Sequence, residues 1–315
     1  ETDYSKKTSQ SRSDPYGGFV YASQESRAIY SQNSINLIDG KSILSIGARL
    51  ENADYEVKES FDTTVSKFAF SSARDPYQTK MNNSAGNIGL EYILDKQNTI
   101  FIKYAEAFRT PDLDARNSTC ANAYSACSNT GTHFFLKDQT SDEIELGLRF
   151  KNRKFNAVSS IYEMNTLNEI RYVPYANNTN LDPIKRKGLN VDFNYDLNEK
   201  TKLNGSFSYI DAHFTSGSLS RGAFAGTYAS NTTTAAERMD SSRNNSDGTY
   251  NIAGLKVPLV AEYTYDIILN YLIAEKTNLK LNMSFVDDMF VSNDQENIEP
   301  KIPNYYLFDV SLNSE

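Results

Sequence analysis

The sequence predicts an all-β protein, an antiparallel transmembrane β-barrel with about eleven strands. Two observations carry this prediction. Apolar and polar residues alternate with a period of two in many separate segments, and the connections between those segments are alternately short and long. Because successive side chains of a strand point to opposite faces of a sheet, each segment has one apolar and one polar face.

The composition excludes several other classes of protein. The 315 residues contain 32 Lys+Arg and 40 Asp+Glu, and this acidic balance disfavours nucleic acid as a partner. The 21 Tyr and 17 Phe are too many for a disordered chain. Apolar stretches such as 257–261 are far shorter than the roughly 20 residues of a membrane-spanning helix. With 2 Cys and 2 His, we expect neither a metal site nor a cofactor.

Residues 189–197 show the alternation most clearly. The odd positions are apolar or aromatic: Leu189, Val191, Phe193 and Tyr195. The even positions are polar: Asn190, Asp192 and Asn194. The polar row cannot lie in a dry core, because unpaired buried polar groups are costly. We therefore expect the apolar row to point outward to lipid and the polar row inward to water.

The expected strands have lengths that suit tilted membrane crossings. They cover residues 27–38, 41–54, 86–94, 98–108, 140–151, 154–172, 184–197, 201–214, 258–273, 277–291 and 304–313. The long connections are expected at about 55–85, 109–139, 173–183, 215–257 and 292–303. Every second connection is short, so all long ones emerge at one edge of the sheet. That asymmetry is typical of outer-membrane barrels, which have tight periplasmic turns and long outer loops.

Other β architectures stay open as alternatives, namely a soluble sandwich, a solenoid or an adhesin. Bacterial single-chain barrels have even strand numbers, and eleven is odd. We therefore expect the 1–315 chain to be one partial barrel domain of a larger barrel. The strands at 27–38 and 304–313 should then form two edges that do not pair with each other.

Six segments resemble, in the same order, motifs of TonB-dependent outer-membrane receptors. They are Tyr104–Leu113, Thr140–Leu148, Asn180–Leu189, Tyr209–Gly217, Val257–Val260 and Asn293–Tyr305. The resemblance covers roughly residues 27–313. It implies a barrel of about 22 strands with a plugged lumen, whose N-terminal plug domain is absent here.

The resemblance also implies a function. Such receptors lie in the outer membrane of Gram-negative bacteria and take up a scarce nutrient, usually a ferric chelate such as a ferric siderophore, sometimes cobalamin or haem. A TonB energy-transducing complex acts on them through the plug, and they perform no covalent chemistry. Ligand should contact the loops at about 55–85, 109–139 and 215–257.

Several loop residues are candidate ligand contacts. A guanidinium offers a planar donor fork to an anionic chelate, and the arginines in or beside long loops are Arg109, Arg116, Arg221, Arg238 and Arg243. Tyr124 would stack on an aromatic ligand or belong to an interfacial aromatic girdle. His133 and His213 would ligate haem iron or be ordinary rim residues.

Cys120 and Cys127 lie in one long loop, with no other Cys to compete for either. An exported protein meets an oxidising compartment, so we expect a disulfide that pins this loop.

A smaller barrel enzyme, such as a hydrolase, is the rival function. Asp211 and His213 are two residues apart on one strand and so share a face, as an acid–base pair would require. No nucleophile motif accompanies them, and we expect no enzyme.

Overall fold

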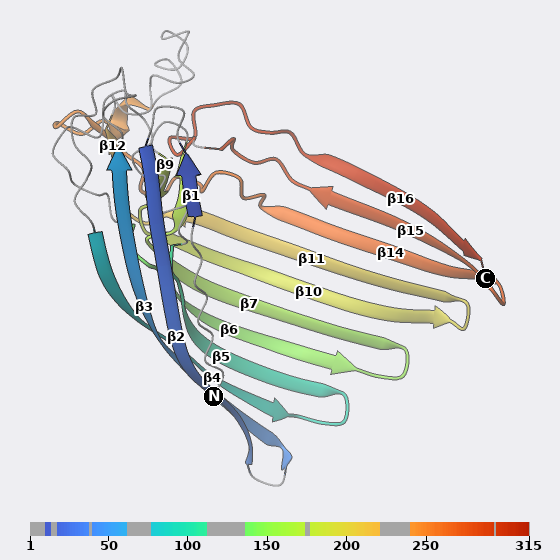
Figure 1. Ribbon diagram of the computed structural model, residues 1–315. Helices are drawn as coiled ribbons and strands as arrows, with labels where there is room; N and C mark the ends of the chain where they lie inside the picture. The colour runs from blue at the N-terminus through green and yellow to red at the C-terminus, as the bar shows by residue number, and fades with distance from the viewer. Residues whose placement is uncertain are drawn as a thin grey trace.

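A computed structural model describes residues 10–13, 18–37, 40–61, 77–111, 136–173, 177–220, 240–292 and 294–314. Its main feature is one antiparallel sheet of 12 strands that follow each other in chain order (Figure 1). The strands are β1 (Gln10–Ser13), β2 (Gly18–Leu37), β3 (Ser42–Phe61), β4 (Tyr77–Ile93), β5 (Asn98–Arg109), β6 (Gln139–Lys151), β7 (Phe155–Leu167), β10 (Ile184–Asn198), β11 (Thr201–Phe214), β14 (Tyr263–Ala274), β15 (Thr277–Val286) and β16 (Tyr305–Ser314).

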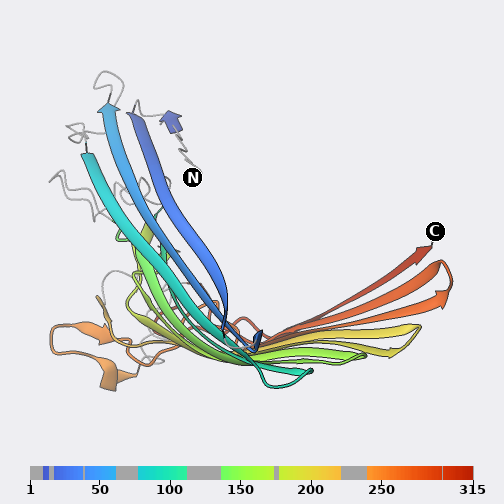
Figure 2. The same ribbon diagram turned by 90° about the horizontal axis from the view of Figure 1, so that it is seen from below.

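The sheet is strongly curved and remains open. Figure 2 shows the first and last strands on opposite arms of the curve. The order of paired strands starts at β1 and ends at β16, and no pairing joins these ends in the part of the chain that the structure describes. The eleven expected strands and the two separate edges are therefore confirmed, and β1 is an additional short strand that the alternation did not predict.

Several expected boundaries were wrong. β2 begins at Gly18 rather than residue 27, β3 continues to Phe61, and β4 begins at Tyr77. These segments carry polar residues on both faces, so alternation alone did not extend the strands into them. The connection expected at 55–85 therefore shortens to 62–76, outside the described residues.

β7, β14 and β15 are shorter than expected at their loop ends, whereas β10 and β11 keep the expected lengths. β7 ends at Leu167, where Asn168 has a positive φ of 56°, and two unexpected hairpins fold in the long connections. They are β8 (Ile170–Val173) with β9 (Asn177–Asn180), and β12 (Ser218–Ser220) with β13 (Thr249–Asn251). A 3₁₀ turn, η3 (Ser241–Arg243), precedes β13.

The two faces of the sheet differ in chemistry, as the alternation predicted. On the apolar face the Phe155 ring centroid lies 6.2 Å from that of Phe193 and 5.9 Å from that of Tyr195. On the polar face Ser208 Oγ donates to Asn190 Oδ1 over 2.8 Å. Ile161, on the apolar face, is 56% exposed, so no second layer of described residues covers it. Such a face is stable only against lipid or another apolar surface.

Aromatic rings lie over glycines of neighbouring strands and fill the space that a side chain would occupy. Phe101 lies over Gly147, where an added Cβ would come within 2.2 Å of the ring. The Arg149 guanidinium stacks on Phe101, 4.5 Å from the ring centroid, and also bonds Glu91 at 2.7 Å. These contacts fix the register of β4, β5 and β6 on the polar face.

Among the described residues, the largest buried cluster lies at the loop-bearing end and not in the middle of the sheet. It joins the ends of β10 and β11 to the connection that follows β11, through Leu181, Ile184, Ala212, Phe214, Tyr250, Ile252 and Val257. Phe214 and Ile252 are both 0% exposed. Among the described residues, no helix is long and apolar enough to cross a membrane.

Candidate functional site

The candidate site is the loop-bearing end of the sheet, which we call the rim. It consists of the described parts of the connections 168–183, 215–262 and 287–304. The rim is folded, because its segments bind one another over long sequence distances. Three groups of contacts hold it together. The first two link different connections, and the third links one connection to the end of β11.

The first group is a half-buried ion network. Glu169 accepts from both Arg171 and Arg186, and the Arg186 Nη1 also donates to Thr166 Oγ1 over 3.0 Å. The exposed side-chain fractions of Glu169 and Arg186 are 14% and 15%. Arg171 Nη1 donates to the carbonyl of Pro258 over 2.9 Å, which joins the β8–β9 hairpin to the next connection. Burial lowers the pKa of Arg171, and the neighbouring Glu169 opposes that shift.

The second group joins the last two connections of the rim. The Asn297 side chain accepts from the Lys256 backbone N–H over 2.7 Å and donates to the Lys256 carbonyl over 3.0 Å. The Asp294 carboxylate accepts from the backbone N–H groups of Ile298 and Glu299. Burial raises the pKa of Glu296 in the same loop, and the charge of Asp294 raises it further.

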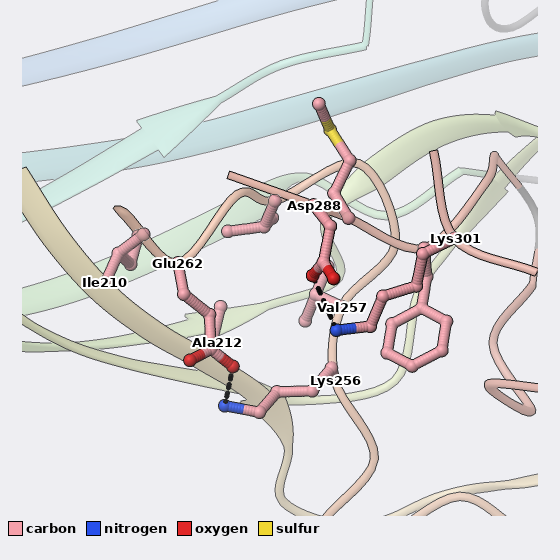
Figure 3. A pocket seen from close by; sticks show the side chains of 10 residues that line it. Ile210, Ala212, Lys256, Val257, Glu262, Asp288 and Lys301 are labelled. Carbon is pink, nitrogen blue, oxygen red and sulfur yellow. Dashed lines mark hydrogen bonds and ion pairs between the residues drawn. The ribbon is translucent and has the colours of Figure 1, made fainter. Parts of the chain in front are cut away.

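The third group is charged and borders a small hollow (Figure 3). Lys256 Nζ lies 2.8 Å from Asp211 Oδ1 and 2.7 Å from Glu262 Oε1. Burial alone would lower the pKa of Lys256, but the hydrogen bonds to these two carboxylates outweigh it and raise that pKa. The hollow encloses about 10 Å³, which is room for about one water molecule. It is too small for a metal chelate.

The structure describes three of the eight ligand-contact candidates, namely Arg109, His213 and Arg243. Arg109 is the last residue of β5, exposed, and on the same face as Lys103. His213 lies on the opposite, apolar face, paired in register with Lys185, with its Nδ1 3.6 Å from Asp211 Oδ2. The structure therefore does not bring these two together. The other candidates lie outside the described residues: Arg116, Tyr124, His133, Arg221 and Arg238, with the cysteines Cys120 and Cys127.

Arg243, the further loop arginine, is described and has a structural role. Its guanidinium donates to the carbonyls of Asn251 and Ala253, the latter over 2.8 Å. Sequence reasoning missed Glu169, Arg171, Arg186 and Asn297 as rim residues. Arg186 and Asn297 lie in two of the segments that resemble receptor motifs, which marked their position but not their contacts. Their partners lie on other strands or connections, and a β-period pattern does not encode those contacts.

Comparison with known proteins agrees with this arrangement. The family model described as TonB dependent receptor-like, beta-barrel, matches residues 1–314. The chain belongs to this family. No curated protein sequence matches the chain.

Several solved structures share the fold. The siderophore receptor PiuA from Acinetobacter baumannii is 16% identical with a TM-score of 0.65, over 92% of this chain and 37% of PiuA. The ferric yersiniabactin uptake receptor FyuA from Yersinia pestis is 14% identical with a TM-score of 0.64, over 94% and 39%. The copper transporter OprC is 14% identical with a TM-score of 0.57, over 93% and 39%.

The chain therefore spans less than two-fifths of the length of these three proteins. The family consists of outer-membrane receptors and transporters, and the structural neighbours are of the same kind. The family and the structural neighbours are receptors and transporters and not enzymes, so they give the hydrolase alternative no support.

Proposed function

We propose that this chain contributes part of the barrel of an outer-membrane receptor that takes up a ferric siderophore or another iron complex in a Gram-negative bacterium. Uptake is energised by the TonB complex through a plug domain. The observation that carries the proposal is the family model, which spans residues 1–314. The connections of the described sheet also gather into a folded rim at one end, as a receptor surface would require. Among the structural neighbours, PiuA is a siderophore receptor and FyuA a ferric yersiniabactin uptake receptor, which favours iron as cargo.

The polar face and the rim supply chemistry that suits an anionic chelate. Arg109 is exposed on the polar face at the loop end, where a ligand entering the lumen would pass. Its guanidinium would bind carboxylate or catecholate oxygens. The loop residues Arg116, Tyr124, His133, Arg221 and Arg238 remain proposed contacts. His213 has less support, because it shares the face of the apolar row.

Uptake by a receptor-deletion strain tests the cargo. Under iron limitation, complemented cells should accumulate radioactive iron supplied as one ferric siderophore, and deletion cells should not. Copper uptake is measured in the same strains, because the chain shares its fold with the copper transporter OprC. Accumulation of copper without iron would contradict the iron assignment. Loss of TonB should abolish uptake and leave surface binding intact. Uptake that persists without TonB would contradict the energised mechanism.

A loop deletion tests where the ligand binds. Removing residues 222–238 should weaken uptake at least tenfold, since loops tolerate change and carry binding groups. The deletion must stop before Tyr250, which is 2% exposed within the rim cluster. A matched control shortens the turn at 198–200, at the other end of the sheet, and should leave uptake unchanged. Normal uptake by the 222–238 deletion would remove this loop from ligand capture.

The pairing of Cys120 and Cys127 is also a proposal. Mass spectrometry of non-reduced peptides from the exported protein should find one peptide pair linked by a disulfide. Two free thiols would contradict the pairing and weaken the placement of that loop outside the cell.

A further inference from the structure

A band of polar side chains crosses the apolar face of the sheet next to the rim. The register places five of them side by side on consecutive strands β5, β6, β7, β10 and β11: Glu106, Asp142, Asn165, Lys185 and His213. The row beneath includes Glu163, Lys187 and Asp211. Below these two rows the same face is apolar, as at Ile161 and Leu189.

The height of the band matches an outer membrane interface. Lys185 lies ten residues above Tyr195 on β10 and on the same face. At about 3.4 Å per residue and a tilt of roughly 40°, ten residues rise about 26 Å along the membrane normal. The apolar band of an outer-membrane barrel is about 25 Å tall. When Tyr195 lies at the inner interface, Lys185 therefore lies at the level of the outer headgroups, and Lys187 lies about 5 Å deeper. Both side chains are on the face that meets the lipid.

Positive charge is in excess at one place in this band. Lys185 Nζ lies 2.7 Å and Lys187 Nζ 3.2 Å from the oxygens of the single carboxylate of Glu163. The exposed side-chain fractions are 30% for Lys185 and 55% for Lys187, so both ammonium groups keep donors free for a ligand.

The rest of the described band has no such excess. Lys256 contacts two carboxylates, those of Asp211 and Glu262. On the other flank, Glu106 and Asp142 accept hydrogen bonds from the uncharged groups of Tyr104 and Asn165, which leaves negative charge there. The two lysines are therefore the place in the described band that attracts an anionic phosphate most strongly.

We propose that Lys185 and Lys187 form a binding site for the phosphate of an outer-leaflet lipid with a phosphorylated headgroup. The site lies outside the lumen and is separate from nutrient capture. It rests on the proposed outer-membrane location but not on iron as the cargo. Two lysines at a lipid interface attract an anionic headgroup, and Glu163 competes with the phosphate for the same ammonium groups.

Lipid titration of the purified receptor in detergent micelles tests the site, with diphosphorylated lipid A as the probe. The double variant K185Q/K187Q should bind it about tenfold more weakly, because each lysine near an anionic headgroup contributes of the order of a few-fold in affinity. The matched control K202Q/K280Q removes two lysines of the polar face, which pair in register with Asn270. This control should bind within twofold of the parent.

Two further binding measurements distinguish a lipid-binding site from lysines that only form an ion pair with Glu163. E163Q should bind lipid A more tightly, by a few-fold, because the competing carboxylate is gone. Dephosphorylated lipid A should bind the parent as weakly as the phosphorylated form binds K185Q/K187Q, and inorganic phosphate should compete only at millimolar concentration.

Equal binding by K185Q/K187Q and the parent would overturn the proposal, and so would weaker binding by E163Q. Heat-modifiable mobility in gels confirms that each variant is a folded barrel before binding is measured. Iron uptake is assayed separately, so loss of lipid binding with normal uptake is distinguished from failure of the proposed function.

Discussion

The middle of the sheet and the rim are stabilised in different ways. In the middle, each described strand pairs only with the strands next to it, and large apolar side chains such as Ile161 and Leu146 are exposed at 56% and 50%. At the rim, Phe214 and Ile252 are fully buried, and three connections bind one another. The middle therefore needs an external apolar solvent, whereas the rim carries its own core. This division suits a protein that spans a membrane with its strands and presents a fixed surface outside it.

The largest expected effect is the loss of Phe214. Phe214→Ala should destabilise the rim by about 3–5 kcal/mol, because a fully buried aromatic side chain leaves a cavity. Amide exchange of β12, β13 and residues 252–257 should accelerate accordingly. Phe308→Ala is the matched control, since Phe308 is 69% exposed on β16. Equal effects of the two substitutions would contradict the difference between rim and middle.

A charge placed on either face of β10 sharpens the same comparison. Val191→Arg should destabilise the folded barrel in lipid by about 2–4 kcal/mol, the cost of arginine at a lipid-facing mid-membrane position. Asn190→Arg, one residue away on the polar face, should change stability by less than about 1 kcal/mol, because that face meets water. Unfolding by urea in vesicles measures both variants. A larger cost for Asn190→Arg would reverse the assigned faces.

Removing the shared carboxylate of the rim should have an intermediate effect. Glu169→Gln leaves the half-buried guanidiniums of Arg171 and Arg186 without their anion, and we expect a cost of about 1–3 kcal/mol. Amide exchange of the β8–β9 hairpin reports this loss. Glu51→Gln, at an ion pair with Arg49 in the middle of β3, is the control and should leave the rim unchanged. Unchanged exchange in Glu169→Gln would show that the network does not hold the hairpin.

The smallest effect concerns pH. The pKa of Glu296 is raised by burial, so its folded value lies above its unfolded value. Its contribution to stability is therefore complete at pH below the unfolded pKa and is lost as pH rises through the folded pKa. In the wild type, the hydrogen-exchange protection of the Ile298 and Glu299 amides should therefore decrease as the pH rises. In Glu296→Gln the same protection should depend less on pH. A pH dependence that is identical in both would assign the effect to another group.

The middle of the sheet and the rim also differ in how well the sequence predicted them. The middle strands followed from alternation, because the period of two is a local property, as at Leu189 to Tyr195. The rim did not, since Asn297 binds the backbone of Lys256, 41 residues away, and no local pattern encodes that contact. The same limit applied to the extra hairpins. Of the ligand-contact candidates, Arg109 and His213 could be assigned to opposite faces only once the register was known.

The most direct test of the account is the environment of successive residues along β10. Single spin labels at positions 189–194 of the receptor in lipid vesicles would be probed with oxygen, which concentrates in lipid, and with a water-soluble nickel chelate. We predict a period of two, with oxygen access highest at Leu189, Val191 and Phe193 and nickel access highest at Asn190, Asp192 and Asn194. Uniform access along the strand, or the opposite phase, would contradict the assignment of the apolar face to lipid.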